Sequence, residues 1–427
     1  MIEVTIISHG IVFGGIQITT LEMIDALKDD IKFNAILCEN ADRHYMAQLI
    51  LRNVRTLFVP CEQHQMYPVM HINSVEKVRD LIKKSDVIWI VDEVHHVVHG
   101  VRKDRHPPIV AHIHSYALVC PWWGASYGFS EICVSRCSIN KIILCKQAIN
   151  DYLYRWGFLS YFQSQVYKQL DLIKGPLDYA LWPVRRAHRT ILEEIDAFVF
   201  PSHSSKNIVL NHVPEIRELS KLTQVIYNPI IVPEDALPKR LTDNKFVVVY
   251  PSGMNIMKGF HILLRAIPHV ILYDRNIVFI LIGLHSSHLK SYLEKVRLIH
   301  YFDKVKNNVI VFPKQPRKLL LKTIASSNIL VLPATIPDPA PRVVAEALIM
   351  GVPAIGSNIG GIKEFVEMNQ SGILVEPNSV AQLVNAIIKA KHIKLNTECI
   401  NEFYKSVFSP IRFKRKFLDL IEKIAHS

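Results

Sequence analysis

The chain has 427 residues, 49% of them hydrophobic and 21% charged, a composition typical of globular proteins that excludes a disordered or fibrous chain. This length exceeds what one hydrophobic core usually serves, so we expect two domains. The net charge of +12 at pH 7 favours an anionic partner, such as a nucleotide, a phospholipid surface, a lipid-phosphate carrier or a nucleic acid, without choosing among them.

The first ten residues, MIEVTIISHG, lack the basic start and the apolar core of a signal peptide. Residues 2–8 have the pattern of a buried strand instead. Elsewhere, no apolar run of the sequence reaches the ~20 residues that a membrane-spanning helix needs. We therefore expect a cytoplasmic protein whose contact with a membrane, if any, is peripheral.

In the first half of the chain, short β-branched runs alternate with segments of helical spacing. Strands are predicted at Val4–Ser8, Phe33–Cys38, Thr56–Val59, Val87–Val91, Ile109–His112, Ala197–Pro201 and Gln224–Asn228, with helices at Leu21–Leu27 and Val75–Ile82. This alternation predicts βαβ units in a doubly wound parallel sheet.

A second alternation follows Pro229–Asn244, a segment with three prolines and mixed charges that we interpret as a linker. The predicted strands are Phe246–Tyr250, Val278–Gly283, Val309–Phe312, Ile329–Pro333 and Pro353–Ser357, and the predicted helices are Gly259–Val270, Leu319–Ser326, Val343–Met350, Val380–Ala390 and Ile411–Ala425. The sequence thus predicts an α/β protein with domains at residues 1–235 and 236–410. The side on which the terminal helix, 411–427, packs is left open.

The stretch from about residue 120 to 190 interrupts the first alternation and is rich in aromatic and basic residues. One interpretation is an insertion that binds an acceptor or docks on a membrane surface. The other is a set of helices packed on the domain with a solvated basic face. Both stay open.

Four of the seven cysteines fall close together, at Cys120, Cys133, Cys137 and Cys145. They are compatible with a structural zinc site, with disulfides, or with buried thiols of a reducing compartment. Because the group contains no Cys-x-x-Cys pair, disulfides are favoured over zinc. We expect at least two of the four to be linked.

Two parts of the sequence have the pattern of a nucleotide site. Gly14-Gly15 stands directly before a predicted helix, where glycine lets the backbone approach a ligand and the helix N-terminus favours negative charge, although a plain turn has the same pattern. In the second half, Asp338 follows a predicted strand and Glu346 lies one turn inside the next helix. Carboxylates at such a sheet edge bind ribose hydroxyls, and the N–H groups at the start of that helix face a diphosphate.

The stretch 329–377 resembles the signature of glycosyltransferase family 4, retaining enzymes of the GT-B fold, in which two Rossmann-like domains face each other across a cleft. The signature is an acidic residue, Glu-Ala eight positions later, Gly-x-Pro, and then Gly-Gly-x-x-Glu. Here these are Asp338, Glu346-Ala347, Gly351-Val352-Pro353 and Gly360-Gly361-Ile362-Lys363-Glu364. Gly14-Gly15, Asn228, Gly253, Lys258-Gly259 and Gly372–Val375 match other parts of the family pattern, so the resemblance covers both halves of the chain.

The resemblance implies a role for each matching position. Glu346 would bind the ribose of a nucleotide sugar, Asp338 the donor sugar near its 3- or 4-hydroxyl, and Lys258 the diphosphate. His114, at the end of a predicted strand, would lie near the transferred sugar. The catalytic residues would then be His114, Asp338 and Lys258, and the donor-binding residues Gly14, Gly15, Gly253, Arg342, Glu346, Gly360 and Gly361.

The implied reaction is sugar transfer from a nucleotide-diphosphate sugar with retention of anomeric configuration. The resemblance implies no metal or other cofactor, and the acceptor, whether a glycan, a lipid-linked molecule or a protein, is not identified. Three positions depart from the family pattern. Asp338 replaces the usual glutamate, Met254 stands where an arginine is expected, and Pro341 replaces a frequent glycine. Arg342 is the candidate replacement for the missing cation.

Two other function classes are compatible with the sequence. Met254 and Pro341 motivate a catalytically silent relative that binds a sugar or a nucleotide. Rossmann-like units also occur in nicotinamide-dependent oxidoreductases, but the first loop lacks Gly-x-Gly-x-x-Gly. A nucleic-acid partner is not expected, because the sequence has no signature of an RNA- or DNA-binding fold.

Overall fold

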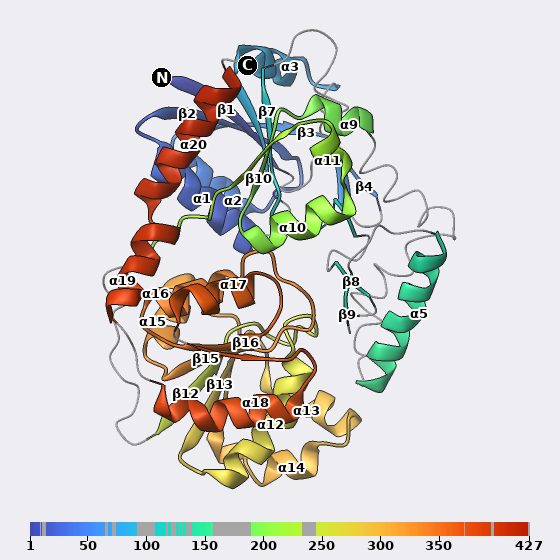
Figure 1. The fold of residues 1–427 in the computed structure, drawn as a ribbon, viewed down its shortest axis with the longest axis vertical. Coiled ribbons are helices and arrows are strands. Elements are labelled where there is room, and N and C mark those ends of the chain that lie inside the picture. The colour runs from blue at the N-terminus through green and yellow to red at the C-terminus, as the bar shows by residue number, and fades with distance from the viewer. Residues whose placement is uncertain are drawn as a thin grey trace.

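The computed structural model describes residues 1–427 except 9, 11–13, 65–66, 71–73, 92–106, 117, 121–124, 128, 130, 134–138, 157–188, 233–244, 371, 394–396 and 426–427. Two parallel sheets, each flanked by helices, form two domains (Figure 1). The residues between the domains include 233–244, so the predicted boundaries at 1–235 and 236–410 stay predictions. Within the described residues, no helix is both long and apolar enough to span a bilayer.

The first sheet has seven strands in the order β11-β10-β7-β6-β1-β2-β3, and all of its pairs are parallel. These are β1 (Ile2–Ile7), β2 (Ile31–Cys38), β3 (Arg55–Val59), β6 (Val87–Val91), β7 (Ile109–His112), β10 (Ala197–Phe200) and β11 (Leu222–Val225). Every residue of β6 and β7 is buried, which explains their continuous apolar runs, because central strands of a parallel sheet are covered on both faces.

The helices of this domain are α1 (Gly15–Leu27), α2 (Arg43–Ile50), α3 (Glu76–Lys84), α9 (Arg189–Glu194), α10 (His203–His212) and α11 (Glu215–Glu218), and β4 (Cys61–His64) pairs with β5 (Tyr67–Met70) in a hairpin. Sequence analysis predicts neither α2 nor α10. Both begin with a side-chain cap, Asp42 for α2 and Ser202 for α10, that accepts backbone N–H bonds in their first turns.

The predicted insertion at 120–190 contains the hairpin of β8 (Ser126–Tyr127) and β9 (Glu131–Ile132), followed by α5 (Ile139–Arg155). Some of the aromatic and basic residues that motivate the insertion, among them Phe158, Tyr161 and Arg185, lie at 157–188, outside the described residues. α5 contacts the second domain: Tyr152 donates a 2.5 Å hydrogen bond to Asn378 Oδ1, and Arg265 lies 4.4 Å from the ring centroid of Trp156. This end of α5 is therefore packed against protein.

The second sheet has six strands in the order β14-β13-β12-β15-β16-β17, again all parallel. They are β12 (Phe246–Tyr250), β13 (Ile277–Ile282), β14 (Val309–Phe312), β15 (Ile329–Leu332), β16 (Ala354–Ser357) and β17 (Gly372–Val375). The chain moves outward from β12 to β13 and β14, then returns to the other side of β12 with β15. This reversal makes the carboxyl ends of β12 and β15 the expected place for a ligand.

The helices of the second domain are α12 (Phe260–Tyr273), α13 (Ser286–Lys295), α14 (Ile299–Asp303), α15 (Arg317–Ala325), α16 (Arg342–Ile349), α17 (Gly360–Asn369), α18 (Val380–Lys389) and α19 (Thr397–Phe403), with short turns η3 (Lys306–Asn308), η4 (Ala390–His392) and η5 (Tyr404–Phe408). The predicted helices and strands of this half agree with these to within three residues at each end. The strand β17 and the helices α13, α14, α17 and α19 are not predicted from the sequence.

The terminal helix α20 (Pro410–Ala425) returns to the first domain, where Figure 1 shows it beside α1. The ring of Phe417 lies 4.5 Å, centroid to centroid, from that of Trp89 in β6. Phe413, Phe417, Leu420 and Ile421 are all buried in the core shared with the first sheet. The structure thus decides the packing side that the sequence leaves open.

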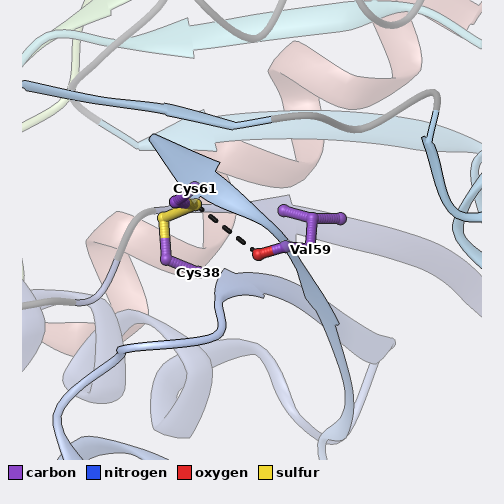
Figure 2. The surroundings of a disulfide bond; sticks show 3 residues. All are labelled: Cys38, Val59 and Cys61. Carbon is purple, nitrogen blue, oxygen red and sulfur yellow. Dashed lines mark hydrogen bonds between the residues drawn. A yellow bond between two sulfur atoms is a disulfide. The ribbon is translucent and has the colours of Figure 1, made fainter. Parts of the chain in front are cut away.

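A disulfide joins Cys38, at the end of β2, to Cys61, at the start of β4 (Figure 2). Sequence analysis does not predict this pair, because Cys38 and Cys61 stand 23 positions apart and outside the close group of the later four cysteines. Of those four, Cys120, Cys133 and Cys145 are buried, and Cys137 lies outside the described residues. Within the described part of the chain, no disulfide joins any two of the three and no metal-binding group forms. A link involving Cys137 stays a prediction.

Candidate functional site

Three loops converge at the carboxyl ends of β12, β13 and β15, and glycines allow them to approach. Gly253 has φ +61°, and a Cβ added to it would lie 2.8 Å from the carbonyl oxygen of Gly283. Gly259 has φ +77°, and its Cβ would lie 1.8 Å from the Pro333 carbonyl oxygen. Only glycine fits at position 259 without a shift of the backbone. The absence of a side chain there allows the loops after β12 and β15 to lie in direct contact.

Lys258 and Asp338 meet at this contact. The Lys258 ammonium forms an ion pair with the Asp338 carboxylate, whose other oxygen accepts a 3.2 Å hydrogen bond from Ala340 N. Lys258 is 34% exposed and Asp338 12%. The structure therefore brings together two of the three predicted catalytic residues, which are 80 positions apart in the chain, with the lysine open to solvent.

The Gly360-Gly361 pair supports Asp338 from the side of α17. Gly360 has φ +58°, and a Cβ on it would lie 2.7 Å from Asp338 N. Gly361 N donates a 2.7 Å hydrogen bond to Asp338 O. The two glycines thus let α17 begin against the loop that carries Asp338. Their direct contact with a donor stays a prediction.

Glu346 lies at the centre of a buried network of charges. Its side chain is fully buried, and its carboxylate pairs with both Arg317 and Arg342. Arg317 Nη1 donates a 2.9 Å hydrogen bond to Glu346 Oε2, and Arg342 Nε lies 2.6 Å from Glu346 Oε1. A carboxylate this deeply buried needs such partners, because desolvation of an unpaired charge is costly.

Arg342 extends this network into the first domain. It forms an ion pair with Glu22 of α1 and donates a 3.2 Å hydrogen bond to Thr19 Oγ1. Burial raises the pKa of Glu22, and the Arg342 guanidinium opposes that rise. Because Arg342 lies between two carboxylates and is only 12% exposed, its cation is already neutralised. A contact of Arg342 with a donor diphosphate stays a prediction.

Arg317 is a site residue that sequence analysis misses. It is the first residue of α15, directly after Pro316 and the loop that follows β14. A basic residue at the carboxyl edge of a strand is the signal that points to it, but nothing local in the sequence connects it with Glu346. Its side chain is 29% exposed, whereas Glu346 is fully buried, so Arg317 is the partner nearer to solvent.

The glycines of the first domain stand where α1 begins. Gly14 is the residue before the helix, and its N–H donates a 3.1 Å hydrogen bond to Gln17 Oε1. A Cβ on Gly15 would meet no atom within 4 Å. The packing of the protein therefore does not require glycine at position 15, and a role in approaching a ligand stays a prediction.

His114 lies two residues beyond β7, with its ring centroid 4.2 Å from that of His112. Burial lowers the pKa of His114 to about 3, and burial followed by the proximity of His114 lowers the pKa of His112 well below its ordinary value. Both imidazoles are therefore neutral near pH 7. A neutral ring is both a hydrogen-bond donor and an acceptor, which suits a contact with a hydroxyl.

Tyr116, two residues after His114, connects this strand end with the second domain. Its side chain is fully buried. Burial raises the pKa of its hydroxyl well above the ordinary value, and the nearby carboxylates of Asp338 and Glu364 raise it further. Sequence analysis does not single out Tyr116.

Glu364 joins the two domains directly. Its carboxylate accepts hydrogen bonds from the backbone N–H groups of His203, at 3.0 Å, and Ser204, at 2.8 Å. Alongside it, Ser202 Oγ donates a 2.5 Å hydrogen bond to Pro339 O. The last position of the Gly-Gly-x-x-Glu motif is thus occupied by contacts between the domains.

Comparison with known proteins shows which families and structures the chain is similar to. Residues 233–406 match the family model described as "Glycosyl transferases group 1". The chain is 26% identical to Spore coat protein SA of Bacillus subtilis over 153 residues, which are 34% of this chain and 40% of that protein. It is 27% identical to an uncharacterized glycosyltransferase of Methanocaldococcus jannaschii over 149 residues, 34% of this chain and 36% of that protein. The matched region thus spans less than half of either relative.

The solved structure of Anabaena HepE in complex with UDP-glucose superposes on nearly the whole chain. The TM-score is 0.62 at 16% sequence identity, and the match covers 99% of this chain and 100% of that one. A likeness at this identity shows the fold. The predicted GT-B architecture of two Rossmann-like domains is confirmed.

Proposed function

We propose that this chain transfers a sugar from a nucleotide-diphosphate sugar to an acceptor hydroxyl, a proposal supported by the match of residues 233–406 to the family model of the group 1 glycosyltransferases. In this reaction the bond from the anomeric carbon to the phosphate oxygen breaks, and a bond to the acceptor oxygen forms. The nucleoside diphosphate leaves, and the hydroxyl proton passes to the departing phosphate.

The observation that carries the proposal is the pairing of Lys258 with Asp338 at the carboxyl ends of β12 and β15. The partly exposed ammonium of Lys258 would neutralise a diphosphate as the leaving group gains charge. The adjacent Asp338 carboxylate would accept hydrogen bonds from hydroxyls of the donor sugar. Neutral His114 would contact the same sugar from the first domain.

Glu346 fits the ribose role only if one of its present partners moves. Arg342 is held on its far side by Glu22, whereas Arg317 is nearer to solvent. We therefore propose that the Arg317 side chain moves away when the donor binds, and that ribose hydroxyls then replace its hydrogen bonds to Glu346. Arg317, once released, would add the cation that Met254 does not supply.

Retention of anomeric configuration is part of the proposal and is supported by the resemblance of Asp338, Glu346 and Gly360-Gly361 to the family 4 signature. In that mechanism the departing phosphate assists the incoming hydroxyl, and no protein nucleophile is needed. The HepE structure holds UDP-glucose, which makes UDP sugars the first donors to test.

The test combines binding with product analysis. Thermal-shift measurements with UDP, GDP and ADP sugars identify the donor, because a ligand that binds the folded state raises apparent stability. NMR of the sugar released from that donor, or transferred to simple acceptors, then gives the anomeric configuration. Retained product supports the proposal, and inverted product overturns the stereochemical part of it.

The missing arginine at Met254 favours one second candidate, a relative that binds a nucleotide sugar without turning it over. The same experiment separates the two functions. A donor that stabilises the protein but yields neither hydrolysis nor transfer would establish the binding protein. If no nucleotide sugar binds at all, both functions are wrong.

A further inference from the structure

A pocket of about 630 Å³ lies between α10 of the first domain and α17 of the second. Figure 1 shows these two helices facing each other between the sheets. The volume of the pocket is within the range of ordinary small-molecule sites, which are about 300–1,000 Å³. Tyr227 contributes to the wall, and the β8–β9 hairpin adds Ile132. Of the residues assigned to the nucleotide-sugar donor, Gly360 lines this pocket.

The charges around this pocket do not suit an anion. Its charged lining side chains are Lys363, Glu364 and Glu367, which leaves a net negative charge in a chain that carries +12 overall. Lys363 pairs with Glu367 at 3.8 Å, and Glu364 already accepts three hydrogen bonds from the first domain. A diphosphate would meet repulsion here without a spare cation.

The uncharged lining suits a ligand with hydroxyl groups. Asn207 and Asn211 lie one turn apart on the exposed face of α10. Asn358, before α17, also lines the pocket, and its Nδ2 donates a 3.1 Å hydrogen bond to Glu376 Oε1, which leaves its amide oxygen to accept. Each amide both donates and accepts hydrogen bonds. Ile208, Ile359 and Met368 supply apolar surface between them. Amides that point at hydroxyls and an apolar surface that covers C–H groups are what a neutral sugar ring needs.

The pocket begins next to the proposed donor-sugar site. Gly360 lines it, and the backbone of Gly360 packs directly against Asp338. We propose that this α10–α17 pocket binds an uncharged sugar residue of the acceptor, an assignment that rests on the proposed transferase function. Since the walls come from both domains, an acceptor bound there contacts both and favours the arrangement in which Glu364 joins them.

The test uses the full chain, a pocket variant and a matched control. The variant is Asn207→Ala with Asn211→Ala, both at exposed helix positions, where substitution does not disturb a core. The control is Asn307→Ala, an exposed asparagine in η3 that does not line the pocket. Calorimetry or saturation-transfer NMR is carried out with maltotriose, lactose, sucrose and diacetylchitobiose, with inorganic pyrophosphate as the anionic probe and UDP as the donor-site probe.

We expect at least one neutral saccharide to bind the wild type and the control alike, and to bind the double variant at least about tenfold more weakly, since two neutral hydrogen bonds are lost. UDP affinity should be unchanged in the variant, and pyrophosphate should not compete with the saccharide. If no saccharide binds the wild type, or if binding is equal in the variant, the pocket proposal is overturned. If a saccharide binds there but no nucleotide sugar binds anywhere, the transferase function fails and the acceptor role with it.

Discussion

The hydroxyl of Tyr227, in the segment that leaves the first sheet, donates a 2.6 Å hydrogen bond to Glu364 on α17 of the second domain. The same carboxylate accepts the N–H groups that open α10, so a residue of one domain caps a helix of the other. Burial raises the pKa of Tyr227, and the Glu364 carboxylate raises it further. The contact therefore fixes how the domains lie relative to each other.

Glu364→Ala should lower the free energy of unfolding by about 1.5–3 kcal/mol, the cost of losing hydrogen bonds to a charged group. Urea denaturation measures this. The matched control is Glu367→Ala on the same helix, which removes only an exposed ion pair with Lys363 and should cost less than about 1 kcal/mol. Equal losses in the two variants would show that the capping contact contributes nothing specific.

Lys258→Ala should reduce turnover of the best donor by at least about tenfold, because the ammonium matters most when the leaving phosphate gains charge. Stability should change little, since Lys258 is 34% exposed. Lys290→Ala is the control, because that lysine is 71% exposed and pairs only with a residue of its own helix. Wild-type turnover in the Lys258 variant would place the diphosphate contact elsewhere, with Arg317 next to be tested.

Glu346→Gln should weaken nucleotide binding and also destabilise the fold. It leaves Arg342 and Arg317 without their shared anion, and breaking a buried ion pair costs about 3–5 kcal/mol. Arg317→Met, by contrast, keeps the Arg342–Glu346 pair and should cost less. Urea unfolding with and without UDP separates the two effects. A Glu346 variant with wild-type UDP affinity would remove this residue from the donor site.

Substitution by alanine should affect the stability of the protein at Gly259 but not at Gly15. Gly259→Ala places a Cβ against the Pro333 carbonyl oxygen and imposes φ +77° on an L-residue, so it should destabilise the protein by at least about 2 kcal/mol. Gly15→Ala meets no atom within 4 Å and should leave thermal unfolding unchanged. If Gly15 does approach the donor, the same variant should bind UDP more weakly. Unchanged affinity would leave Gly15 as an ordinary helix start.

Acid should destabilise the protein through His112 and His114. Their pKa values are lowered in the folded state, to about 3 for His114, whereas in the unfolded chain a histidine titrates near 6.5. Between these values the unfolded state binds more protons, so stability is full above pH ~6.5 and falls as the pH decreases toward ~3. Urea midpoints at pH 7.5, 6 and 4.5 measure the slope. His114→Gln should flatten it, and an unchanged slope would contradict the burial of this ring.

The sequence by itself determines the fold class and most strands of the two parallel sheets. β6 and β7 are unbroken apolar runs, and their predicted bounds, Val87–Val91 and Ile109–His112, agree with the structure. Such agreement is expected, because burial on both faces leaves its mark on every residue of a strand. The residues from Asp338 to Glu364 likewise carry the resemblance to a glycosyltransferase signature, since their spacing is set within one short segment that contains α16, β16 and the start of α17.

Only the tertiary structure decides the partners of those residues. Arg317 pairs with Glu346 from a different loop, Glu364 caps a helix 160 positions away, and Cys38 bonds to Cys61 across an intervening strand. α5 packs against Arg265 of the second domain, and α20 against Trp89 of the first. Local periodicity records whether a side chain is buried, but it carries no information on which distant loop ends at the same sheet edge. Which loops meet at one edge is decided by the spatial order of the strands in each sheet and by the glycines that let those loops approach closely.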